Sequence, residues 1–572
     1  MNNAEIAKVF YDVADLLDLK GENPFKIRAY QKAARSIEHS SVELEQVVKE
    51  GKNLREIPGV GEAIEQKIID LVKTGKLKLF EDLKKEFPKG ITTFLDIPGV
   101  GPKTANLLAN KLGISSIEEL EAAIVSGRVS RLYRMGDKTA ENILHNIQAL
   151  RNKDQRIPIG EALAVVDEIS AQLKDVPGLK NLVAAGSLRR FRETIGDIDL
   201  MGTASDARAV IHAFTRLPVV KEVIARGPTK ASVRVAGGLQ VDLRIMEHEA
   251  FGSLLQYFTG SKEHNIILRK RALRQGFSLS EYGITDVKTG ELERFATEEA
   301  FYKRLGLQYI PPEIREAGRE IEKAAKGEIP RLIEPGDIKG DLHVHTDWSD
   351  GRDSLEDEAA AAKERGYEYI AITDHSRGLG ITKGLDVERL DKQIAEIKEL
   401  NRKLNGIRVL TGMEVDIHAD SKLDMPDEAL AKLDFVIASI HSGFNESREK
   451  MMGRIIKAME NSNVDMYAHP TCRLLPGREP VAVDMEELFK AALRTGTVLE
   501  INASPGRLDL KDTHIYHARE LGVKMIMSTD SHSVEHFDFM RFGIGIARRG
   551  WCEAKDVLNT RTLKEFLGKL KK

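Results

Sequence analysis

The feature that most constrains this chain is a pattern repeated along residues 339–572. Short apolar runs, such as Y-E-Y-I-A-I-T and D-F-V-I-A-S-I, end beside a histidine or an acidic residue, and helical stretches separate the runs. Strands that alternate with helices form parallel sheets or barrels, in which the carboxyl ends of the strands meet at one rim. Binding and catalytic side chains gather at that rim. We therefore expect a parallel β/α domain with a polynuclear metal site.

The residues at these strand ends are of metal-ligating types. They are His343, His345, Asp350, Asp374, His375, Glu414, His441, His469, Asp530 and His532. His343 and His345 are two residues apart, so on a strand both point to one face while Leu342 and Val344 point into the core. Nitrogen and carboxylate ligands suit zinc, manganese or iron. Any one histidine has a simpler interpretation as a buried or surface residue, but the repeated topological position favours a shared site.

This segment resembles the PHP (polymerase and histidinol phosphatase) family of phosphoesterases, whose domain is a distorted β/α barrel with a three-metal site. The resemblance implies one set of metal ligands, namely His343, His345, Asp350, His375, Glu414, His441, His469, Asp530 and His532. It also implies that Glu414 is a bridging carboxylate and that up to three Mn²⁺ or Zn²⁺ ions bind. Such ions polarise a phosphoryl group, lower the pKa of a bound water and stabilise the leaving oxygen.

Length and composition indicate an ordinary globular protein of several domains. The chain has 572 residues, of which 42% are hydrophobic and 31% charged, and this length exceeds a single core. No apolar run approaches the ~18 residues of a membrane span, and the start M-N-N-A-E-I-A-K-V-F lacks a signal peptide's apolar region. We therefore expect a cytoplasmic protein without membrane contact. Its only cysteines, Cys472 and Cys552, fit a reducing compartment.

The first 155 residues read as helices joined by short turns that contain glycine and proline. The motif I-P-G-V-G occurs at 57–61 and again at 97–101, and a weaker copy begins at Tyr133. The net charge of −3 means that any nucleic-acid binding must come from such local motifs. Glycines allow a tight turn, and the free N–H groups of the next helix can hold a phosphate. The candidate DNA-binding glycines are Gly59, Gly61, Gly99 and Gly101.

This repeat resembles the helix-hairpin-helix family, which grips the nucleic-acid backbone without reading bases. The alternative is that the two copies are plain helix–turn–helix connections.

The middle of the chain contains a cluster of carboxylates. In G-D-I-D-L, Asp197 and Asp199 share one face of a strand, and Asp242 in Q-V-D-L-R can bring a third carboxylate beside them. Three such groups repel one another unless cations hold them, so a site for two Mg²⁺ ions is the natural interpretation. Two metals are the usual clamp for in-line phosphoryl transfer. A lone D-x-D is more often a solvated strand end.

With the upstream A-A-G-S-L-R-R, this cluster resembles the nucleotidyltransferase palm of family X DNA polymerases. Y-F-T-G-S at 257–261 is similar to the nucleotide-binding segment of that family. The resemblance implies that Ser187 and Arg190 hold the triphosphate, that Asn265 contacts the base and that Tyr257 lies under the sugar. The implied nucleotide-binding residues are Gly186, Ser187, Arg190, Tyr257, Phe258, Gly260 and Asn265. Without this context, Tyr257 and Phe258 read equally well as core.

We therefore predict a multidomain α/β protein that resembles bacterial or archaeal family X polymerases fused to a PHP domain. The expected ranges are 1–85, a helical DNA-binding domain with a helix-hairpin-helix; 86–155, a fingers-like helical domain with the second; 156–248, the nucleotidyltransferase palm; 249–320, a helical and mixed thumb with the nucleotide-binding subdomain; 321–338, a linker; and 339–572, the PHP phosphoesterase domain, a distorted β/α barrel.

The N-terminal region has one further candidate site. Lys67 aligns with the Schiff-base lysine of the family's deoxyribose-phosphate lyase, and Lys26 and Tyr30 match other positions there. A Schiff base needs an unprotonated amine, which neighbouring cations or a dry pocket favour. Ala63 stands where the animal enzymes carry a lysine, so a weak lyase or abasic-site endonuclease activity and a plain surface lysine both remain open.

The expected function is a template-directed DNA polymerase that fills short gaps during repair, with a PHP-domain 3′–5′ exonuclease. Its expected partners are gapped or primer-template DNA and dNTPs, and the expected state is a monomer. One alternative makes the barrel a 3′-end or small-molecule phosphatase. Another makes the palm a catalytically idle scaffold that only binds DNA.

Overall fold

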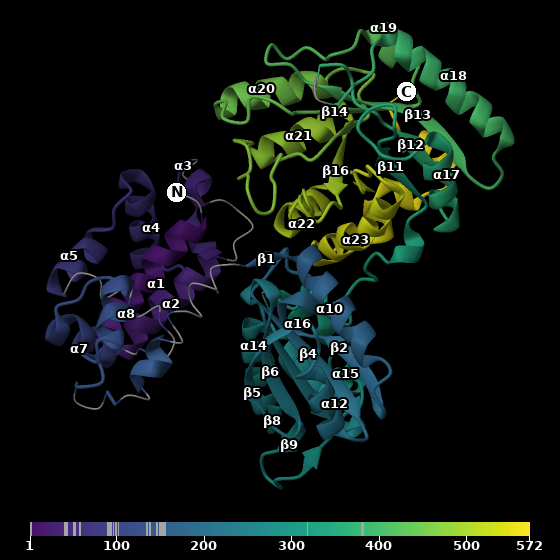
Figure 1. Ribbon diagram of the computed structural model, residues 1–572. Helices are drawn as coiled ribbons and strands as arrows, with labels where there is room; N and C mark the ends of the chain where they lie inside the picture. Colours follow the sequence, from purple (N-terminus) through teal and green to yellow (C-terminus); the bar gives the residue numbers. More distant parts are fainter. Residues whose placement is uncertain are drawn as a thin grey trace. The chain divides into compact units, whose positions relative to one another are not determined.

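The computed structural model describes residues 3–571 except 39–43, 50–52, 57–58, 88–93, 95–96, 98–99, 101, 133–134, 137–138, 145–146, 148–155, 317 and 379–381. The chain divides into two compact units, Met1–Gln155 and Arg156–Lys572 (Figure 1). Within the described ranges, no helix has both the length and the apolar character needed to cross a membrane.

The first unit is helical throughout its described residues. Its main helices are α1 (Asn3–Leu19), α2 (Pro24–Glu38), α3 (Leu44–Lys49), α4 (Glu62–Thr74), α5 (Lys78–Glu86), α7 (Pro102–Leu112) and α8 (Ile117–Val125), with a 3₁₀ turn η1 (Leu54–Glu56). In α4, Ile64, Ile68 and Leu71 are buried, because residues four and three apart share one helix face. Gly75 ends α4 in the left-handed conformation at φ 68°, which glycine adopts without steric cost.

The second unit begins with a mixed sheet. Its strands are β2 (Leu179–Ala184), β4 (Asp197–Ala204), β5 (Val220–Arg226), β6 (Lys230–Val235) and β7 (Gln240–Met246), in the order β2-β4-β7-β6-β5. Helices α10 (Ile159–Leu173) and α12 (Ala207–Phe214) share a core with this sheet. The short strands β1 (Ile157–Pro158) and β3 (Thr194–Ile195) pair beside α11 (Gly186–Arg189). Strands β4 and β7 are parallel neighbours at the centre, so their first residues lie at the same sheet edge.

A mainly helical region follows the mixed sheet. It consists of α13 (Phe251–Thr259), α14 (Lys262–Arg274), α15 (Glu298–Arg304), α16 (Arg319–Lys326) and the antiparallel strands β8 (Phe277–Ser280), β9 (Gly283–Asp286) and β10 (Leu292–Glu293). The 3₁₀ turn η3 (His248–Ala250) leads into this region and η4 (Pro312–Ile314) lies within it, whereas η2 (Ala236–Gly238) connects β6 and β7 of the mixed sheet. Gly260, between α13 and α14, has a φ of 69° and precedes a cis peptide bond to Ser261.

The expected linker, 321–338, is packed rather than exposed. Helix α16 runs across its first residues, and Ile321, Ile329 and Leu332 belong to the core of the helical region. Ile333 and Ile338 belong to the core of the barrel that follows. The Pro and Gly content of the segment indicates a break in regular structure, but its apolar residues bury themselves on both neighbours.

The C-terminal part is a parallel barrel surrounded by helices. Its strands follow one another in chain order: β11 (Gly340–Val344), β12 (Tyr369–Ile372), β13 (Arg408–Asp416), β14 (Phe435–Ser439), β15 (Met466–Tyr467), β16 (Val498–Asn502) and β17 (Met525–Ser528). Val344 on the first strand bridges Ser531 just after the last, so the sheet nearly closes on itself. Most strand residues are buried on both faces, as in covered parallel sheets.

Eight helices belong to the described part of this domain; the first six connect successive strands, and the last two follow β17. They are α17 (Leu355–Glu364), α18 (Val387–Lys403), α19 (Asp427–Leu430), α20 (Arg448–Met459), α21 (Met485–Thr495), α22 (Asp512–Leu521), α23 (Met540–Arg549) and α24 (Leu563–Leu567). The 3₁₀ turns are η5 (Pro335–Asp337), η6 (Val534–Phe539), η7 (Ala554–Asp556) and η8 (Leu558–Thr560). Helix α23 lies against the mixed-sheet region (Figure 1), and its Phe542 belongs to the core of that sheet.

Candidate active sites

The barrel rim collects all nine metal ligands that the PHP resemblance implies. His343 and His345 lie in and just after β11, and Glu414 lies in β13. The others follow the carboxyl ends of their strands, at His375, His441, His469, Asp530 and His532, and Asp350 lies in the loop after β11. The parallel topology brings these positions to one rim, although they are spread over most of the domain's sequence.

The donor atoms form overlapping groups that are close enough to hold metal ions. Within each group the donor atoms all lie within 4.8 Å of one another: His345, Asp350, His375 and His532; His343, His345 and Asp530; and His375, Glu414 and His441. His469 completes the cluster, because its Nε2 lies 3.1 Å from Oε1 of Glu414. Glu414 also lies 2.9 Å from Nδ1 of His375 and 3.4 Å from Nε2 of His343, so its carboxylate is central.

The buried donors at the rim fit a cation. Among the described residues, Nε2 of His343, both ring nitrogens of His345 and Oε2 of Glu414 are buried without a hydrogen-bond partner. Buried polar atoms without partners are rare unless an ion or a water satisfies them. Burial and the neighbouring His532 and His375 lower the pKa of His345 to about 3, so His345 is neutral and able to donate a lone pair to a metal.

The charges at the rim are strongly coupled. Burial opposes ionisation of Glu414, but His375, His343 and His441 outweigh it and hold the pKa of Glu414 well below its usual value. Burial likewise opposes the charging of His532, while Asp350 and Asp530 raise its pKa to about 9. Anionic carboxylates beside buried imidazoles are the donor chemistry that zinc and manganese prefer.

The structure adds supporting residues that the sequence motifs did not reveal. Glu500, fully buried in β16, lies 2.7 Å from Nδ1 of His343 and accepts a hydrogen bond from the backbone N–H of His469 at 2.6 Å. A carboxylate in this place fixes the ring orientation of a metal-binding histidine. An acidic residue inside the apolar run V-L-E-I-N was the available signal. Arg507 lies 3.3 Å from Asp530.

Asp374, which stands beside His375 in the sequence, is not at the metal cluster. Its carboxylate accepts hydrogen bonds from the backbone and hydroxyl of Thr346, from Ser349 and from Gln393. It therefore holds the loop after β11 in place.

The predicted palm carboxylates lie together at the centre of the mixed sheet. Asp197 and Asp199 are at the start of β4, and Asp199 is directly opposite Asp242 of β7. Burial, then Asp197, then Asp242, raise the pKa of Asp199 to about 7. Among the described residues, the three carboxylates Asp197, Asp199 and Asp242 do not form a group in which all donor oxygens lie within 4.8 Å of one another. A site that gathers carboxylates in this way stabilises bound cations, because like charges cannot otherwise share it.

Gly186 forms the wall next to these carboxylates. It begins α11 with a φ of 58°, and a Cβ at this position would lie 2.7 Å from Oδ2 of Asp199. Only glycine fits without displacing the carboxylate. Ser187 follows in the same short helix, half-buried.

The predicted nucleotide-binding segment has protein partners in this structure. Nδ2 of Asn265 donates to the carbonyl of Tyr257 at 2.8 Å, and the side-chain oxygen of Asn265 accepts from Gln256 at 2.8 Å. Arg190 donates to the carbonyl of Thr259 at 2.6 Å and to Glu316 at 3.2 Å. Asn265 and Arg190 therefore shape the segment, and their contacts with a base or a triphosphate remain predictions.

The rings of Tyr257 and Phe258 are in contact. They meet edge to face with centroids 5.2 Å apart. Arg244 lies over Phe258, and Arg269 over Tyr257, at 4.5 Å and 5.3 Å from the ring centroids. Both rings are half-buried, so neither is a simple core residue.

The glycines of the first hairpin occupy the turn before α4. Gly59 has a φ of 93°, and a Cβ there would lie 2.9 Å from Cγ of Lys32. Gly61 precedes the first residue of α4. Gly99 and Gly101, from the second copy, lie outside the described residues.

The predicted lyase residues are not gathered in a dry pocket. Nζ of Lys67 donates to the carbonyl of Ala63 at 2.9 Å on the exposed side of α4. Lys26 pairs with Glu22 at 3.0 Å. Tyr30 is a core residue, and burial raises its pKa to about 12.

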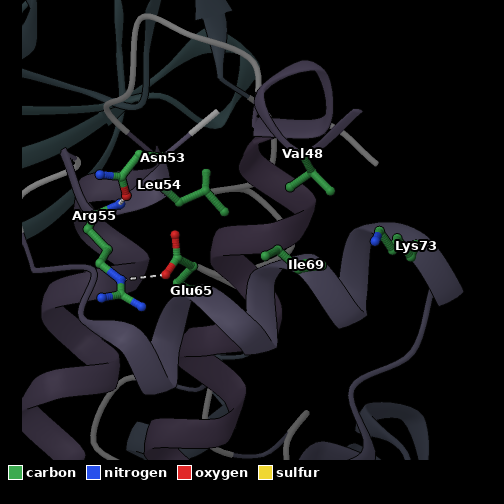
Figure 2. Close-up of a pocket in the computed structure, with 7 residues that line it drawn as sticks. All are labelled: Val48, Asn53, Leu54, Arg55, Glu65, Ile69 and Lys73. Atoms are coloured by element: carbon green, nitrogen blue, oxygen red, sulfur yellow. Dashed lines mark hydrogen bonds and ion pairs between the residues drawn. The ribbon is translucent and has the colours of Figure 1, made fainter. Parts of the chain in front are cut away.

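A cavity of about 430 Å³ does lie beside α4, but Lys67 is not among the described residues that line it (Figure 2). It is lined by Val48, Asn53, Leu54, Arg55, Glu65, Ile69 and Lys73. Nε of Arg55 is 2.6 Å from Oε2 of Glu65, as the dashed line in Figure 2 marks. The guanidinium is thus paired within the protein.

Family models match much of the chain. The model described as a helix-hairpin-helix domain matches residues 1–77, and a SAM-like helix-hairpin-helix tandem matches 91–149. The DNA polymerase beta thumb matches 254–316, and the PHP domain matches 341–504.

Curated relatives cover the same parts. The chain is 40% identical over 574 residues to the DNA polymerase/3′-5′ exonuclease PolX of Bacillus subtilis (strain 168), covering 100% of both chains. A probable phosphatase of Thermoanaerobacter sp. (strain X514) is 30% identical over 41% of this chain and 95% of its own length. DNA polymerase lambda of Rattus norvegicus is 26% identical over 46% of this chain and 48% of its own.

Proposed function

Because this chain belongs to the family X DNA polymerases that carry a C-terminal PHP domain, we propose that it acts on DNA at two separate sites. It is a DNA polymerase with a 3′–5′ exonuclease. In our proposal the mixed sheet extends a primer into short gaps with dNTPs, and the barrel removes 3′-terminal nucleotides. The observation that supports this division is that the palm carboxylates and the rim cluster of histidines and carboxylates lie in two different sheets.

At the palm, we assign Asp197, Asp199 and Asp242 to two Mg²⁺ ions. Such ions supply Lewis-acid stabilisation of the transferred phosphoryl group when bound. Asp199 and Asp242 are fixed opposite each other by the β4–β7 pairing, so the strands set the spacing of their oxygens. Gly186 leaves room for phosphates beside Asp199, and Ser187 presents its hydroxyl from the same helix.

At the rim, we assign His343, His345, Asp350, His375, Glu414, His441, His469, Asp530 and His532 to Mn²⁺ or Zn²⁺ ions, of which the resemblance allows up to three. These ions polarise the scissile phosphoester and activate a water when bound. Glu500 holds His343 in one orientation. Arg507 is close enough to Asp530 to neutralise part of the local negative charge.

In the helical unit, we assign DNA-backbone contacts to the turn at Gly59–Gly61, where free N–H groups of α4 can meet a phosphate. The second copy of the motif, with Gly99 and Gly101, is assigned the same role from its sequence. Lys67 is the proposed Schiff-base lysine of a weak lyase. Borohydride trapping on an incised abasic substrate tests it, and trapping by Lys67→Ala equal to that of the natural chain would remove Lys67 from the mechanism.

Two variants test the separation of the sites. Asp242→Ala should lose primer extension by several powers of ten, because electrostatic stabilisation of the transition state is withdrawn, while 3′-end degradation persists. The double variant His343→Ala/His345→Ala should lose degradation and bound metal while extension persists. Both activities are measured on one preparation of each protein, and normal extension by Asp242→Ala would refute the palm assignment.

A further inference from the structure

The PHP domain contacts the palm directly through α23. A Cβ at Gly545 in this helix would overlap the ring of Phe191, which follows Arg190 in the turn after α11. The rings of Phe191 and Phe542 have centroids 6.3 Å apart. Phe191 has a φ of 59°, a left-handed conformation that a bulky residue keeps only where its surroundings hold it. The turn at Arg190–Phe191 therefore packs tightly against α23.

Arg549, the last residue of α23, is the polar part of the same contact. Its Nη1 donates to the backbone carbonyl of Arg190 at 2.6 Å and to Oε1 of Glu316 at 2.9 Å. Its Nη2 donates to Asp512 of the PHP domain at 2.6 Å. The side chain is 3% exposed. Burial opposes its charge, but Asp512 and Glu316 raise its pKa above the usual value, so Arg549 is a cation.

Glu316 connects Arg549 to the predicted nucleotide-binding segment through Arg190. The same Oε1 that accepts from Arg549 accepts from Nε of Arg190 at 3.2 Å. Nη1 of Arg190 in turn donates to the carbonyl of Thr259 at 2.6 Å, next to Gly260. Arg549 thus pairs with both Glu316 and Asp512, and Arg190 pairs with Glu316, within one partly buried network. Removing one member of such a network leaves another without its partner.

We propose that Arg549 of the PHP domain is a positioning residue for nucleotide incorporation by the palm. Its hydrogen-bond partners among the described residues are Arg190, Glu313, Glu316 and Asp512, none of which is a palm carboxylate. It acts by fixing the Arg190 turn and, through Glu316, the 259–260 segment, which together form the triphosphate side of the site in the function proposed above. A planar guanidinium with several donors can bridge Asp512, Glu316 and a carbonyl at once, whereas a lysine ammonium cannot match that geometry.

The test compares Arg549→Ala, Arg549→Lys and Gly545→Ala in the full chain. Gly545→Ala disturbs the same turn through Phe191 without removing a charge. Arg541→Ala is the matched control, because Arg541 lies in the same helix and pairs across the same interface with Asp167 at 3.6 Å, with side chains 51% and 62% exposed. The readouts are KM for dNTP and kcat on gapped DNA, 3′-end degradation, bound metal per chain and the melting midpoint.

Arg549→Ala should raise KM for dNTP by about tenfold with a smaller change in kcat, since a displaced binding segment weakens the ground-state complex. Gly545→Ala should reproduce the direction, Arg549→Lys should lie between, and Arg541→Ala should match the natural chain. Degradation and metal content should stay unchanged in all of them. An unchanged KM in both Arg549→Ala and Gly545→Ala would overturn the proposal, and so would parallel loss of both activities with a lowered melting midpoint. Asp242→Ala, assayed alongside, separates this result from failure of the palm assignment itself.

Discussion

At the scale of single residues, the raised pKa of Asp199 supports the proposal that the palm binds cations. Its pKa is raised from 3.8 to about 7 by burial and then by Asp197 and Asp242. Because the folded pKa lies above the unfolded one, the folded state holds this proton more tightly. Its contribution to stability is therefore most favourable at pH below 3.8 and is lost as pH rises toward 7.

In the proposed function Mg²⁺ binds at Asp199, and such binding would offset that loss. We expect added Mg²⁺ to raise the melting midpoint more at pH 8 than at pH 5.5, and we expect Asp199→Asn to reduce this pH difference. Thermal unfolding of both proteins with and without Mg²⁺ measures it, after the other metals have been loaded to the same level. An identical Mg²⁺ effect in the natural chain and in Asp199→Asn would show that the ion binds elsewhere.

Tyr257 carries a prediction about sugar choice. Its ring is half-buried beside Phe258, and its carbonyl is already bound by Asn265, so Tyr257→Ala removes the ring and leaves the backbone contact in place. If the ring excludes a ribose 2′-hydroxyl, discrimination against ribonucleotides should fall by roughly tenfold. Incorporation of matched rNTP and dNTP is compared, with Tyr282→Ala as an exposed control. Unchanged discrimination would exclude the ring as the gate.

At the scale of secondary-structure elements, the barrel strands do more than present ligands at their ends. Strand β16 contributes no predicted ligand, yet its Glu500 contacts His343 and His469 from below the rim. Alternate side chains of a strand in a barrel point inward. An acidic residue inside the barrel, below the rim, can therefore orient the histidine rings at the rim.

Glu500→Gln should therefore weaken metal binding while the fold is kept. The amide preserves the shape but removes the charge that orients and activates the imidazole of His343, and such losses cost about ten- to a hundredfold in metal affinity. Metal affinity by titration with a chelator is the measurement. Glu486→Gln, in the nearby α21 and paired with His517 at 3.3 Å and with Lys490 at 3.9 Å, is the control. Equal affinities would assign Glu500 a purely structural role.

At the scale of the whole molecule, the PHP barrel and the palm share packing. Leu508 and Phe542 of the barrel belong to the palm core, and Arg473 of the barrel pairs with Glu193 of the palm at 2.7 Å. The barrel is therefore not packed as an independent body, although most of its core is its own.

The fragment 339–572 should bind metal but melt at a lower temperature than the same domain in the full chain. Cutting the chain exposes Leu508 and Phe542 and leaves Arg473 without Glu193, and burying each large apolar side chain is worth about 1.5–3 kcal/mol. We also expect it to degrade DNA poorly, because it lacks the helical unit. Calorimetry measures the melting temperature and a 3′-end assay measures DNA degradation, both for the fragment and for the fragment with Phe542→Ser. A fragment as stable and as active as the full chain would contradict both expectations.

The sequence alone indicated the class of each part and supplied candidate residues for each site, because those signals are local. A strand's ligands follow its apolar run, D-x-D places two carboxylates on one face, and alternating strands and helices favour a parallel sheet or barrel. These patterns repeat within a few residues, where side-chain periodicity is readable.

Only the tertiary structure decided how the parts support one another. Arg549 meets Arg190 across 359 positions of sequence, and Glu500 meets His343 across 157. Neither contact produces a periodic pattern in the sequence, because a buried ion pair or hydrogen bond depends on where two distant elements pack. The packing of segment 321–338 could not be predicted from the sequence for the same reason, since its apolar residues contact partners in both the thumb and the barrel. Motifs of a few residues reveal the ligand types of each site, but the contacts by which one site positions another form only when distant elements pack together.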